Sequence, residues 1–218
     1  ALFALTGAMP PHLRHKRLPA PSRANLRLLS HPLYITGTGL TLNVLDFGAK
    51  PGDQTFDNTQ AFQAALDAAG QKGGVIVVVP AGEYALAGQL SVPDRVTLQG
   101  VSLWEPTAKQ QWDNSTAGSV LYPTFGHGNE TAGAFISLGY GSALAGLTVY
   151  YPQQVPPAPK ATQWQPIPYD VTVDILSDNG AIVDCMFVNP YHAIRSLKMG
   201  RHFINNVHGQ PLSRGIVV

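Results

Sequence analysis

Charged side chains are scarce in this sequence, at 12% of the 218 residues, against about 25% in ordinary globular domains. The formal net charge is +1, which gives no case for nucleic acid or an anionic membrane surface as a partner. Apolar runs of about 18 or more residues are also missing, so no helix is predicted to span a membrane. The single cysteine, Cys185, excludes an intrachain disulfide, and its apolar surroundings at 181–188 predict a core residue.

Glycine and proline are plentiful by contrast, with 22 and 18 residues, which is typical of short strands joined by tight turns. Short strands are predicted at 134–138, 147–151, 171–175, 181–188, 193–197, 202–207 and 215–218. Ile194 and Ile216 are 22 positions apart, and Pro190 and Pro211 are 21 apart. A period in the low twenties indicates stacked coils, and the spacing of leucine-rich repeats is absent.

The densest local signals lie at residues 43–100. At 43–49, Val44 and Asp46 alternate with Leu45 and Phe47, which predicts a short, half-buried strand. Turn residues follow, and an acidic or amide side chain at 57 or 58 is predicted to cap a helix.

The predicted helix carries apolar residues at spacings of three and four, namely Ala61, Phe62, Ala65, Leu66 and Ala69. Gly70 and the pair Gly73-Gly74 are predicted to end it. The five β-branched residues at 75–79 then predict a strand that is buried on both faces. Two more short strands are predicted at 84–86 and 96–100.

This order of signals resembles the opening of the pectate-lyase-like superfamily of right-handed parallel β-helices. That group includes polygalacturonase and rhamnogalacturonase relatives, some β-1,3-glucanases, epimerase-like proteins and phage tailspikes. The resemblance is carried by V-x-D-F-G-A at 44–49, Gly52-Asp53, Asp57-Asn58-Thr59 before the helix, the run from Gly73 to Tyr84, and V-T-L-x-G at 96–100. Asn58 stands where the family usually has the second aspartate of a D-D-T triplet.

The resemblance implies an all-β fold, a right-handed parallel β-helix (a single-stranded solenoid) with a short α-helix that caps its N-terminal end. Residues 43–218 are expected to form the N-terminal part of this domain, after an irregular leader at 1–42. The leader has a basic cluster at 12–27, which is interpreted as a solvated segment rather than a polyanion site. Because the chain ends within a predicted strand at 215–218, more coils are expected beyond Val218.

Two longer insertions with little strand character are predicted between the strands. The first, 100–133, contains Trp104, Trp112 and the glycosylation sequons at Asn114 and Asn129. It either presents aromatic rings to sugars or packs on the coil through its own tryptophans. The second, 150–169, is rich in proline and holds Trp164.

No catalytic residue is assigned from the sequence. Polygalacturonases are recognised by N-T-D, D-D, G-H-G and R-I-K motifs in successive coils. Gly126-His127-Gly128 matches one of these in letters but lacks its partners, and the R-S-L-K at 195–198 does not match R-I-K. Asp170, Asp174 and Asp178 are spaced at four, but calcium needs six to eight oxygen ligands. No metal site or other cofactor is therefore predicted, and calcium is expected only if the protein is a lyase.

Alternation within the predicted strands identifies outward-facing polar residues. It places Thr172 and Asp174 outward in 171–175, and it places Val183 inward and Asp184 outward in 181–188. Arg195 follows Asp174 by 21 positions, so the two are predicted to be neighbours on adjacent coils.

An outer groove that grips an acidic or neutral glycan is one interpretation of these residues. Its candidate substrate-binding residues are Asp174, Asp184, His192, Arg195, His208 and Trp164. The competing interpretation is a surface ion pair with histidines in turns, and such pairs contribute little to stability. Asn205 and Asn206 are interpreted as a turn ladder rather than as catalytic groups.

Three function classes stay open. The favoured class, which the family resemblance implies, is a glycoside hydrolase of pectin or a related polysaccharide. Hydrolases of this family cleave with paired carboxylates. The second is a polysaccharide lyase or epimerase, and the third is a non-catalytic glycan-binding or structural β-helix such as an adhesin or tailspike. In each case the expected partner is a polysaccharide or oligosaccharide, and the expected location is outside the cell or on its surface. The catalytic residues are expected beyond Val218, and the oligomeric state is left open.

Overall fold

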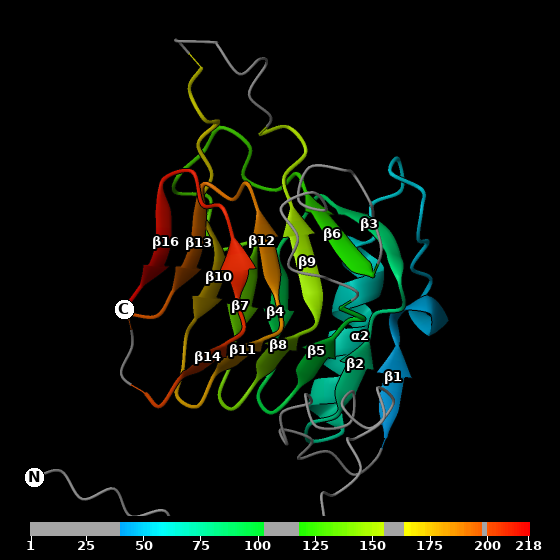
Figure 1. Cartoon of the computed structure of the whole chain (residues 1–218). Coiled ribbons are helices and arrows are strands. Elements are labelled where there is room, and N and C mark those ends of the chain that lie inside the picture. The colour runs from blue at the N-terminus through cyan, green and yellow to red at the C-terminus, as the bar shows by residue number, and fades with distance from the viewer. Residues whose placement is uncertain (1–39, 103–117, 155–163, 198–199) are drawn as a thin grey trace, which may run out of the picture. The chain divides into compact units, whose positions relative to one another are not determined.

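The computed structural model describes residues 40–102, 118–154, 164–197 and 200–218, all within the compact unit Tyr34–Val218. The predictions for leader residues 1–39, Trp104, Trp112 and the sequon at Asn114 lie outside these residues. Positions 41–42, predicted to be part of the irregular leader, instead belong to a strand, Thr41–Asn43. Within the described ranges the strands form three parallel sheets that we call A, B and C (Figure 1).

Neighbouring strands within each sheet are hydrogen-bonded in chain order throughout the described part of the chain. Sheet A contains β1 (Thr41–Asn43), β2 (Ile76–Val78), β5 (Thr97–Gln99), β8 (Ala143–Ala145), β11 (Ala181–Val183) and β14 (Phe203–Asn205). Sheet B contains β3 (Gly82–Leu86), β6 (Ser119–Pro123), β9 (Leu147–Tyr150), β12 (Met186–Val188) and β15 (His208–Gly209). Sheet C contains β4 (Leu90–Val92), β7 (Ile136–Leu138), β10 (Val171–Ile175), β13 (His192–Arg195) and β16 (Arg214–Val217).

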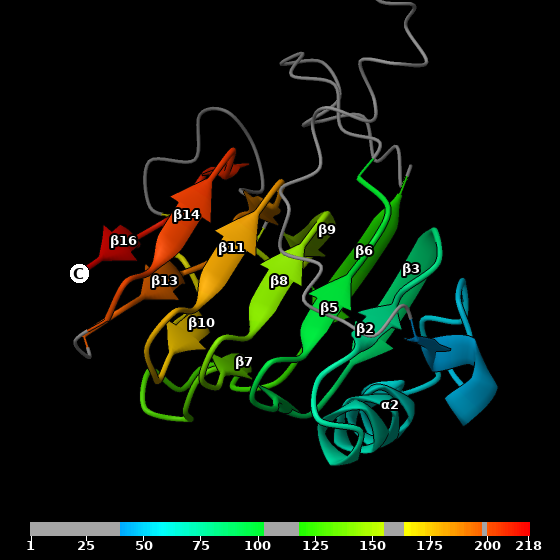
Figure 2. The same cartoon turned by 90° about the horizontal axis from the view of Figure 1, so that it is seen from below.

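From β2 onward the chain visits sheets A, B and C in turn, and each strand pairs in parallel with its counterpart in the next coil. Figure 2 shows the strands of sheet A lying side by side in chain order. The register aligns Val173 with Ile194 and Ile194 with Ile216, so the period read from the sequence is confirmed. The fold is a right-handed parallel β-helix, as predicted.

Inward-facing residues of the three sheets form one continuous core along the stack. Its rows include Leu98, Leu144 and Ile182 from sheet A, and Leu121, Val149 and Phe187 from sheet B. Burying one such side chain contributes roughly 1.5–3 kcal/mol. Cys185 lies in the same core, where burial raises the pKa of its thiol to about 12.

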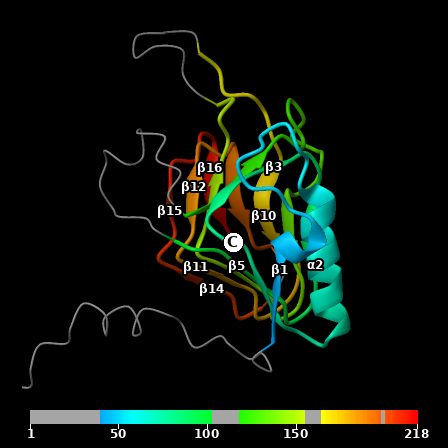
Figure 3. The ribbon, with the colours of Figure 1, turned by 90° about the vertical axis from the view of Figure 1, so that its right-hand side faces the viewer.

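The predicted cap helix is α2 (Thr59–Gln71), which lies beside β2 at the first-coil end of the stack (Figure 2). The view along the stack shows α2 next to β1 (Figure 3). The buried residues of α2 are the five apolar positions expected from the spacing.

The N-cap position of α2 is Asn58, whose side chain makes no capping hydrogen bond. The residue before it, Asp57, accepts the N–H of the first helical residue, Thr59, on Oδ1 at 3.0 Å. Asn58 instead accepts from Lys50 N and donates to the Phe56 and Ala85 carbonyls. An aspartate at this position could not make those two donations, which gives a physical reason for the asparagine.

The predicted strand at 43–49 is wrong. Val44–Phe47 forms a 3₁₀ helix, η2, and the strand β1 ends at Asn43. The Asn43 side chain accepts the Leu45 N–H, and Gly48 closes the turn at φ +95° with its N–H on the Leu45 carbonyl. Local capping therefore overrides the alternating pattern.

Two further strand predictions need correction. Residues 75–79 are not buried on both faces, because Ile76 and Val78 are only partly buried in β2, as expected for a solenoid wall with one face outward. The segment 100–133 is expected from its sequence to have little strand, yet β6 within it is fully buried. None of the described helices is long and apolar enough to cross a membrane.

The run at 181–188 is two strands rather than one. Asp184 adopts a left-handed conformation, φ +53°, and turns the chain from β11 to β12. Gly146 and Asn206 make the same turn in the neighbouring coils, at φ +64° and +49°. The corner breaks the alternation, so Ile182 lies in the main core, whereas Val183 belongs to a small separate cluster with Ala143 and Ala181.

Candidate functional site

The outer face of sheet C carries a row of polar side chains at one register position. Parallel pairing aligns Ser91 with Ser137, Ser137 with Asp174, and Asp174 with Arg195. Asp174 and Arg195 are therefore neighbours on adjacent coils, as predicted. Because neighbouring strands of a sheet lie about 4.8 Å apart, their side chains can reach each other. The serines are small, so Asp174 and Arg195 are the prominent functional groups of this row.

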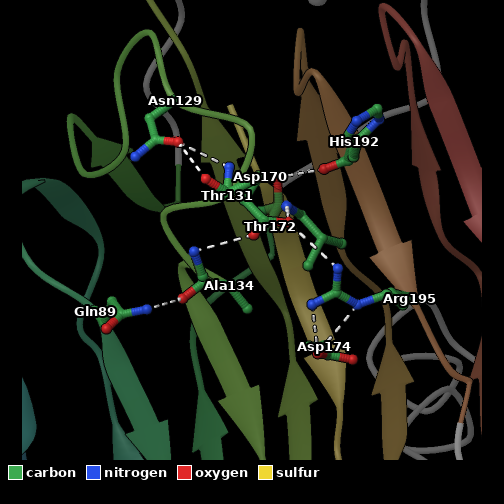
Figure 4. Close-up of polar contacts among 11 residues, drawn as sticks. Gln89, Asn129, Thr131, Ala134, Asp170, Thr172, Asp174, His192 and Arg195 are labelled. Carbon is green, nitrogen blue, oxygen red and sulfur yellow. Dashed lines mark hydrogen bonds and ion pairs between the residues drawn. The ribbon is translucent and has the colours of Figure 1, made fainter. Parts of the chain in front are cut away.

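Arg195 bridges two carboxylates. Its Nε and Nη2 donate to Asp174 Oδ2 at 3.1 and 2.7 Å, and its Nη1 donates to Asp170 Oδ1 at 3.3 Å (Figure 4). The side chains of Asp170 and Asp174 are 12% and 13% exposed, and that of Arg195 is 33% exposed. The hydrogen bond to Asp174 is the main reason that the pKa of Arg195 is raised. We call these three residues the arginine cluster.

Asp170 also connects the arginine cluster to the loop 124–133. Its Oδ2 accepts the Gly133 N–H at 3.0 Å, and the next carbonyl, Ala134, accepts from Gln89 Nε2 at 3.0 Å. Figure 4 shows that the C-terminal end of the loop is hydrogen-bonded to Asp170 on one side and to Gln89 on the other. Asp170 is not among the binding residues predicted from the sequence. Its spacing of four from Asp174 is visible there, but its contact with a distant loop is not.

The same loop also contacts the residues that precede β10 and β13 in the next two coils. We call this edge of sheet C, where its strands begin, the flank of sheet C. Gly128 N–H donates to the Pro168 carbonyl at 2.9 Å, and the His127 ring packs edge-on against Tyr169 at 5.6 Å. Glu130 forms a hydrogen bond that raises the pKa of Tyr191. His127 therefore lies in a turn beside an aromatic ring, and no described contact gives the G-H-G letters a catalytic setting.

His192 begins β13 on this flank. Its carbonyl accepts a hydrogen bond from Thr172 Oγ1 at 2.9 Å, and Thr172 also bonds the Tyr151 hydroxyl at 2.9 Å. Thr172 is fully buried, so its predicted outward exposure is wrong. Tyr169 Oη and His192 Nδ1 are buried and have no hydrogen-bond partner among the described residues. Buried polar atoms normally have partners, so these two atoms are places where a ligand group or water would be stabilised.

Protonation of His192 is expected to destabilise the fold at acidic pH. Burial, followed by the charge of Arg214, lowers the pKa of His192, whereas the pKa of histidine in an unfolded chain is about 6.5. Between those values the folded state binds fewer protons than the unfolded chain, so stability is lost as the pH falls below about 6.5. Urea unfolding at about pH 7.5 and about pH 5 should show a larger loss in the wild type than in His192→Gln. Equal losses in the two proteins would contradict this assignment.

Asp184 and His208 lie elsewhere. Asn206 Nδ2 donates to Asp184 Oδ1 at 2.6 Å, and His208 Nε2 bonds Asn206 Oδ1 at 2.7 Å. Asp184 and Asn206 lie at the corner between sheets A and B, and not on sheet C. Of the two asparagines predicted to form a turn ladder, only Asn206 lies in a turn, because Asn205 belongs to β14. Trp164 is half-buried in the irregular segment before β10. Of the six predicted binding residues, the structure thus brings together Asp174, Arg195 and His192. The role of all six in binding stays a prediction.

The arginine cluster does not fit a calcium site. The carboxylate oxygens that face each other across the cluster already accept hydrogen bonds from Arg195, and a cation there would meet a guanidinium. The described residues hold no group of three or more potential metal ligands among His, Cys, Asp and Glu.

The fold is that of a pectate-lyase-like parallel β-helix. The family model described as "Rhamnogalacturonase A/epimerase, pectate lyase-like" matches residues 41–149, half of the chain, and the protein belongs to this family. The matched region ends before Asp170, so it establishes the family without reaching the arginine cluster.

Two curated relatives come from Azotobacter vinelandii. Alginate lyase 7 is 39% identical over 87 residues, which cover 36% of this chain and 10% of the lyase. Mannuronan C5-epimerase AlgE5 is 40% identical over 87 residues, which cover 36% of this chain and 9% of the epimerase. The match thus spans about a tenth of each relative's length.

A solved structure shares the fold at low sequence identity. It is the tailspike protein gp49 of the Acinetobacter baumannii bacteriophage Fri1, a capsular polysaccharide depolymerase, with a TM-score of 0.52 and 12% identity. The similarity covers 83% of this chain and 38% of the tailspike, and it supports the fold alone.

Proposed function

We propose that the protein is a carbohydrate-active enzyme that holds a polysaccharide on the outer face of sheet C and hydrolyses it. The observation that carries the proposal is the arginine cluster. In it Arg195 pairs with its register partner Asp174 and also with Asp170, which directly precedes β10. Sugar hydroxyls both donate and accept hydrogen bonds. A carboxylate beside a guanidinium offers both kinds of partner at once. Within the described residues the Asp174 carboxylate accepts hydrogen bonds only on Oδ2, which leaves Oδ1 for a ligand.

Exposed apolar side chains follow two strands of this face. Leu176, two residues after Asp174, is 40% exposed, and Tyr140, which follows β7 in the preceding coil, is 42% exposed. A sugar ring has an apolar C–H face as well as hydroxyl groups, so exposed apolar side chains next to a polar cluster suit carbohydrate. The names of the two relatives, a lyase and an epimerase of alginate-type polysaccharides, support the same substrate class.

Within the reaction, Asp170 and Asp174 are assigned to substrate binding. Glycoside hydrolysis needs one carboxyl group that donates a proton and a second that acts as base or nucleophile. Each of these aspartates uses an oxygen as an acceptor for Arg195, an arrangement that suits charge pairing rather than proton donation.

Elimination or epimerisation at a uronate unit is the second candidate, and His192 favours it. Such reactions need a base that removes a carbon-bound proton, and the lowered pKa of His192 keeps its imidazole neutral near pH 7. The nearby Arg214 could neutralise a substrate carboxylate, and two relatives are named as a lyase and an epimerase.

The products of a substrate panel separate these reactions. The protein is incubated with pectic, rhamnogalacturonan, alginate and β-glucan polysaccharides, and both new reducing ends and the absorbance of unsaturated uronides are measured. Reducing ends without unsaturation are expected, and a chelator should leave the rate unchanged. Unsaturated products would instead establish a lyase. Epimerisation produces neither signal and is detected by proton exchange at C5.

Asp174→Ala is expected to lower turnover or affinity at least about tenfold, because hydrogen bonds to charged groups contribute roughly 1.5–3 kcal/mol. Asp46→Ala is the matched control, since Asp46 is an exposed acid in η2. Unchanged affinity and turnover in Asp174→Ala would rule out the arginine cluster as the binding site. No binding or turnover by a folded wild type would favour a structural role.

We further propose that the protein acts outside the cell or on its surface, since a polysaccharide is too large to reach a cytoplasmic enzyme intact. Detection of the protein only in the cytoplasmic fraction of its native host would contradict this.

A further inference from the structure

We propose that the sugar unit bound at the arginine cluster is neutral and hydroxyl-bearing rather than a uronate. This inference rests on the proposed function and specifies its substrate class. The relatives named for alginate chemistry would suggest an acidic glycan, but the local charges of this chain point the other way.

The charge balance of the cluster is the first argument. Two aspartates surround one arginine, so the cluster carries a net charge of about −1 when all three groups are ionised. Glu130 and Arg214, the next charged groups on this flank, offset each other. An incoming carboxylate would therefore meet net negative charge.

The hydrogen-bonding capacity of Arg195 is the second argument. A guanidinium has five N–H groups, and Arg195 uses three of them on Asp170 and Asp174. The two that remain have Asp oxygens as neighbours. A hydroxyl can accept from an N–H and donate to a carboxylate, whereas an ionised carboxylate only accepts. A hydroxyl group therefore matches both kinds of group at the cluster, whereas the carboxylate that distinguishes a uronate matches only the N–H groups.

The rigidity of the cluster is the third argument. For Arg195 to bind a uronate with its full fork, it would have to leave two carboxylates that are 12% and 13% exposed. Asp170 is also fixed by the Gly133 N–H, so it cannot follow Arg195 outward without releasing the loop. Leaving partly buried carboxylates unpaired is costly, which opposes that rearrangement.

Matched pairs of oligosaccharides test the inference directly. Oligogalacturonides and alginate oligomers are each compared with their carboxyl-reduced forms, which keep the linkage and replace each carboxylate by a CH₂OH group. Isothermal titration with the wild-type protein should give at least about tenfold tighter binding of the reduced form in the pair that fits the site. Tighter or equal binding of the acidic form would overturn the inference.

Salt supplies a readout that needs no variant. Because screening weakens repulsion between charges, affinity for the acidic oligomer should rise as sodium chloride is raised from about 0.01 M to about 0.15 M. Affinity for the reduced oligomer should stay constant. A fall in the affinity for the acidic oligomer would show attraction by a cation and would overturn the inference.

Asp174→Asn tests the cause. It removes one negative charge with little change in shape, so the preference for the reduced oligomer should shrink about tenfold. Asp46→Asn makes the same charge change on an exposed residue of η2 and should leave the preference unchanged. Failure of every oligomer to bind would overturn the proposed function itself, whereas a preference for the acidic form would overturn only its neutral substrate.

Discussion

Phe62→Ala is expected to destabilise the protein by about 3–5 kcal/mol, the range measured when a buried phenylalanine is truncated. Phe62 is fully buried in α2, and its ring packs edge-on against Tyr84 of β3 with 5.2 Å between centroids. The helix covers the first-coil end of the core, and a coil buries its inner face only against its neighbours. The substitution therefore leaves a cavity between the cap and the first coil.

The urea midpoint of unfolding measures this effect, and hydrogen exchange locates it. Slowly exchanging amides of β2 and β3 should lose protection before those of β10 and β13. Gln60→Ala is the control, because Gln60 is exposed on the same helix and alanine is a good helix former. A loss of less than about 1 kcal/mol in Phe62→Ala would show that the core does not depend on the helix.

The cap helix could be read from the sequence because its signals are local. A turn acid, apolar residues at spacings of three and four, and a glycine pair each act within a few residues, and Phe62 and Leu66 are buried as their spacing requires. Asn43 shows the limit of such patterns. Its side chain stabilises a 3₁₀ turn at 44–47, so four alternating residues are not enough to specify a strand.

The pair at the centre of the site could be predicted because the coil period is constant there. A spacing of 21 residues places Arg195 beside Asp174, and the register confirms it. The prediction also places Asp184 on the same outer face, because it treats 181–188 as one strand and continues the alternation through the turn at Asp184. Its left-handed conformation turns the chain into another sheet, and an aspartate carries little sign of that in a single sequence.

The rest of the site comes from a loop without periodicity. Gly133 and Glu130 lie 37 positions before Asp170 and 61 before Tyr191. Nothing in the intervening sequence fixes where a loop of this kind returns to the sheet. The charge balance of the cluster depends on Asp170, so the preference for a neutral sugar could not be inferred without the structure.

Arg195→Ala is expected to cost about 2–4 kcal/mol of stability, somewhat below the range for a fully buried pair, because the arginine itself is 33% exposed. Asp170 and Asp174 would then face each other on one sheet without a cation. Asp174→Ala should cost less, because Arg195 keeps Asp170 as a partner. The free energy of unfolding of both single variants and of the double variant gives the coupling between the two side chains.

We expect the double variant to be more stable than the sum of the single losses predicts, with a coupling of roughly 1–3 kcal/mol. Arg195→Lys refines the result, because an ammonium keeps the charge but cannot present the planar fork that reaches both carboxylates. If charge alone holds the cluster together, Arg195→Lys will restore nearly all of the stability. If the fork is required, the stability of the lysine variant will resemble that of Arg195→Ala. Its ammonium group is then no longer fixed between two aspartates, so this variant should bind acidic oligomers better than the wild type does. Additive losses would instead show that Asp174 and Arg195 act independently, and the rigidity argument for a neutral sugar would fail with that result.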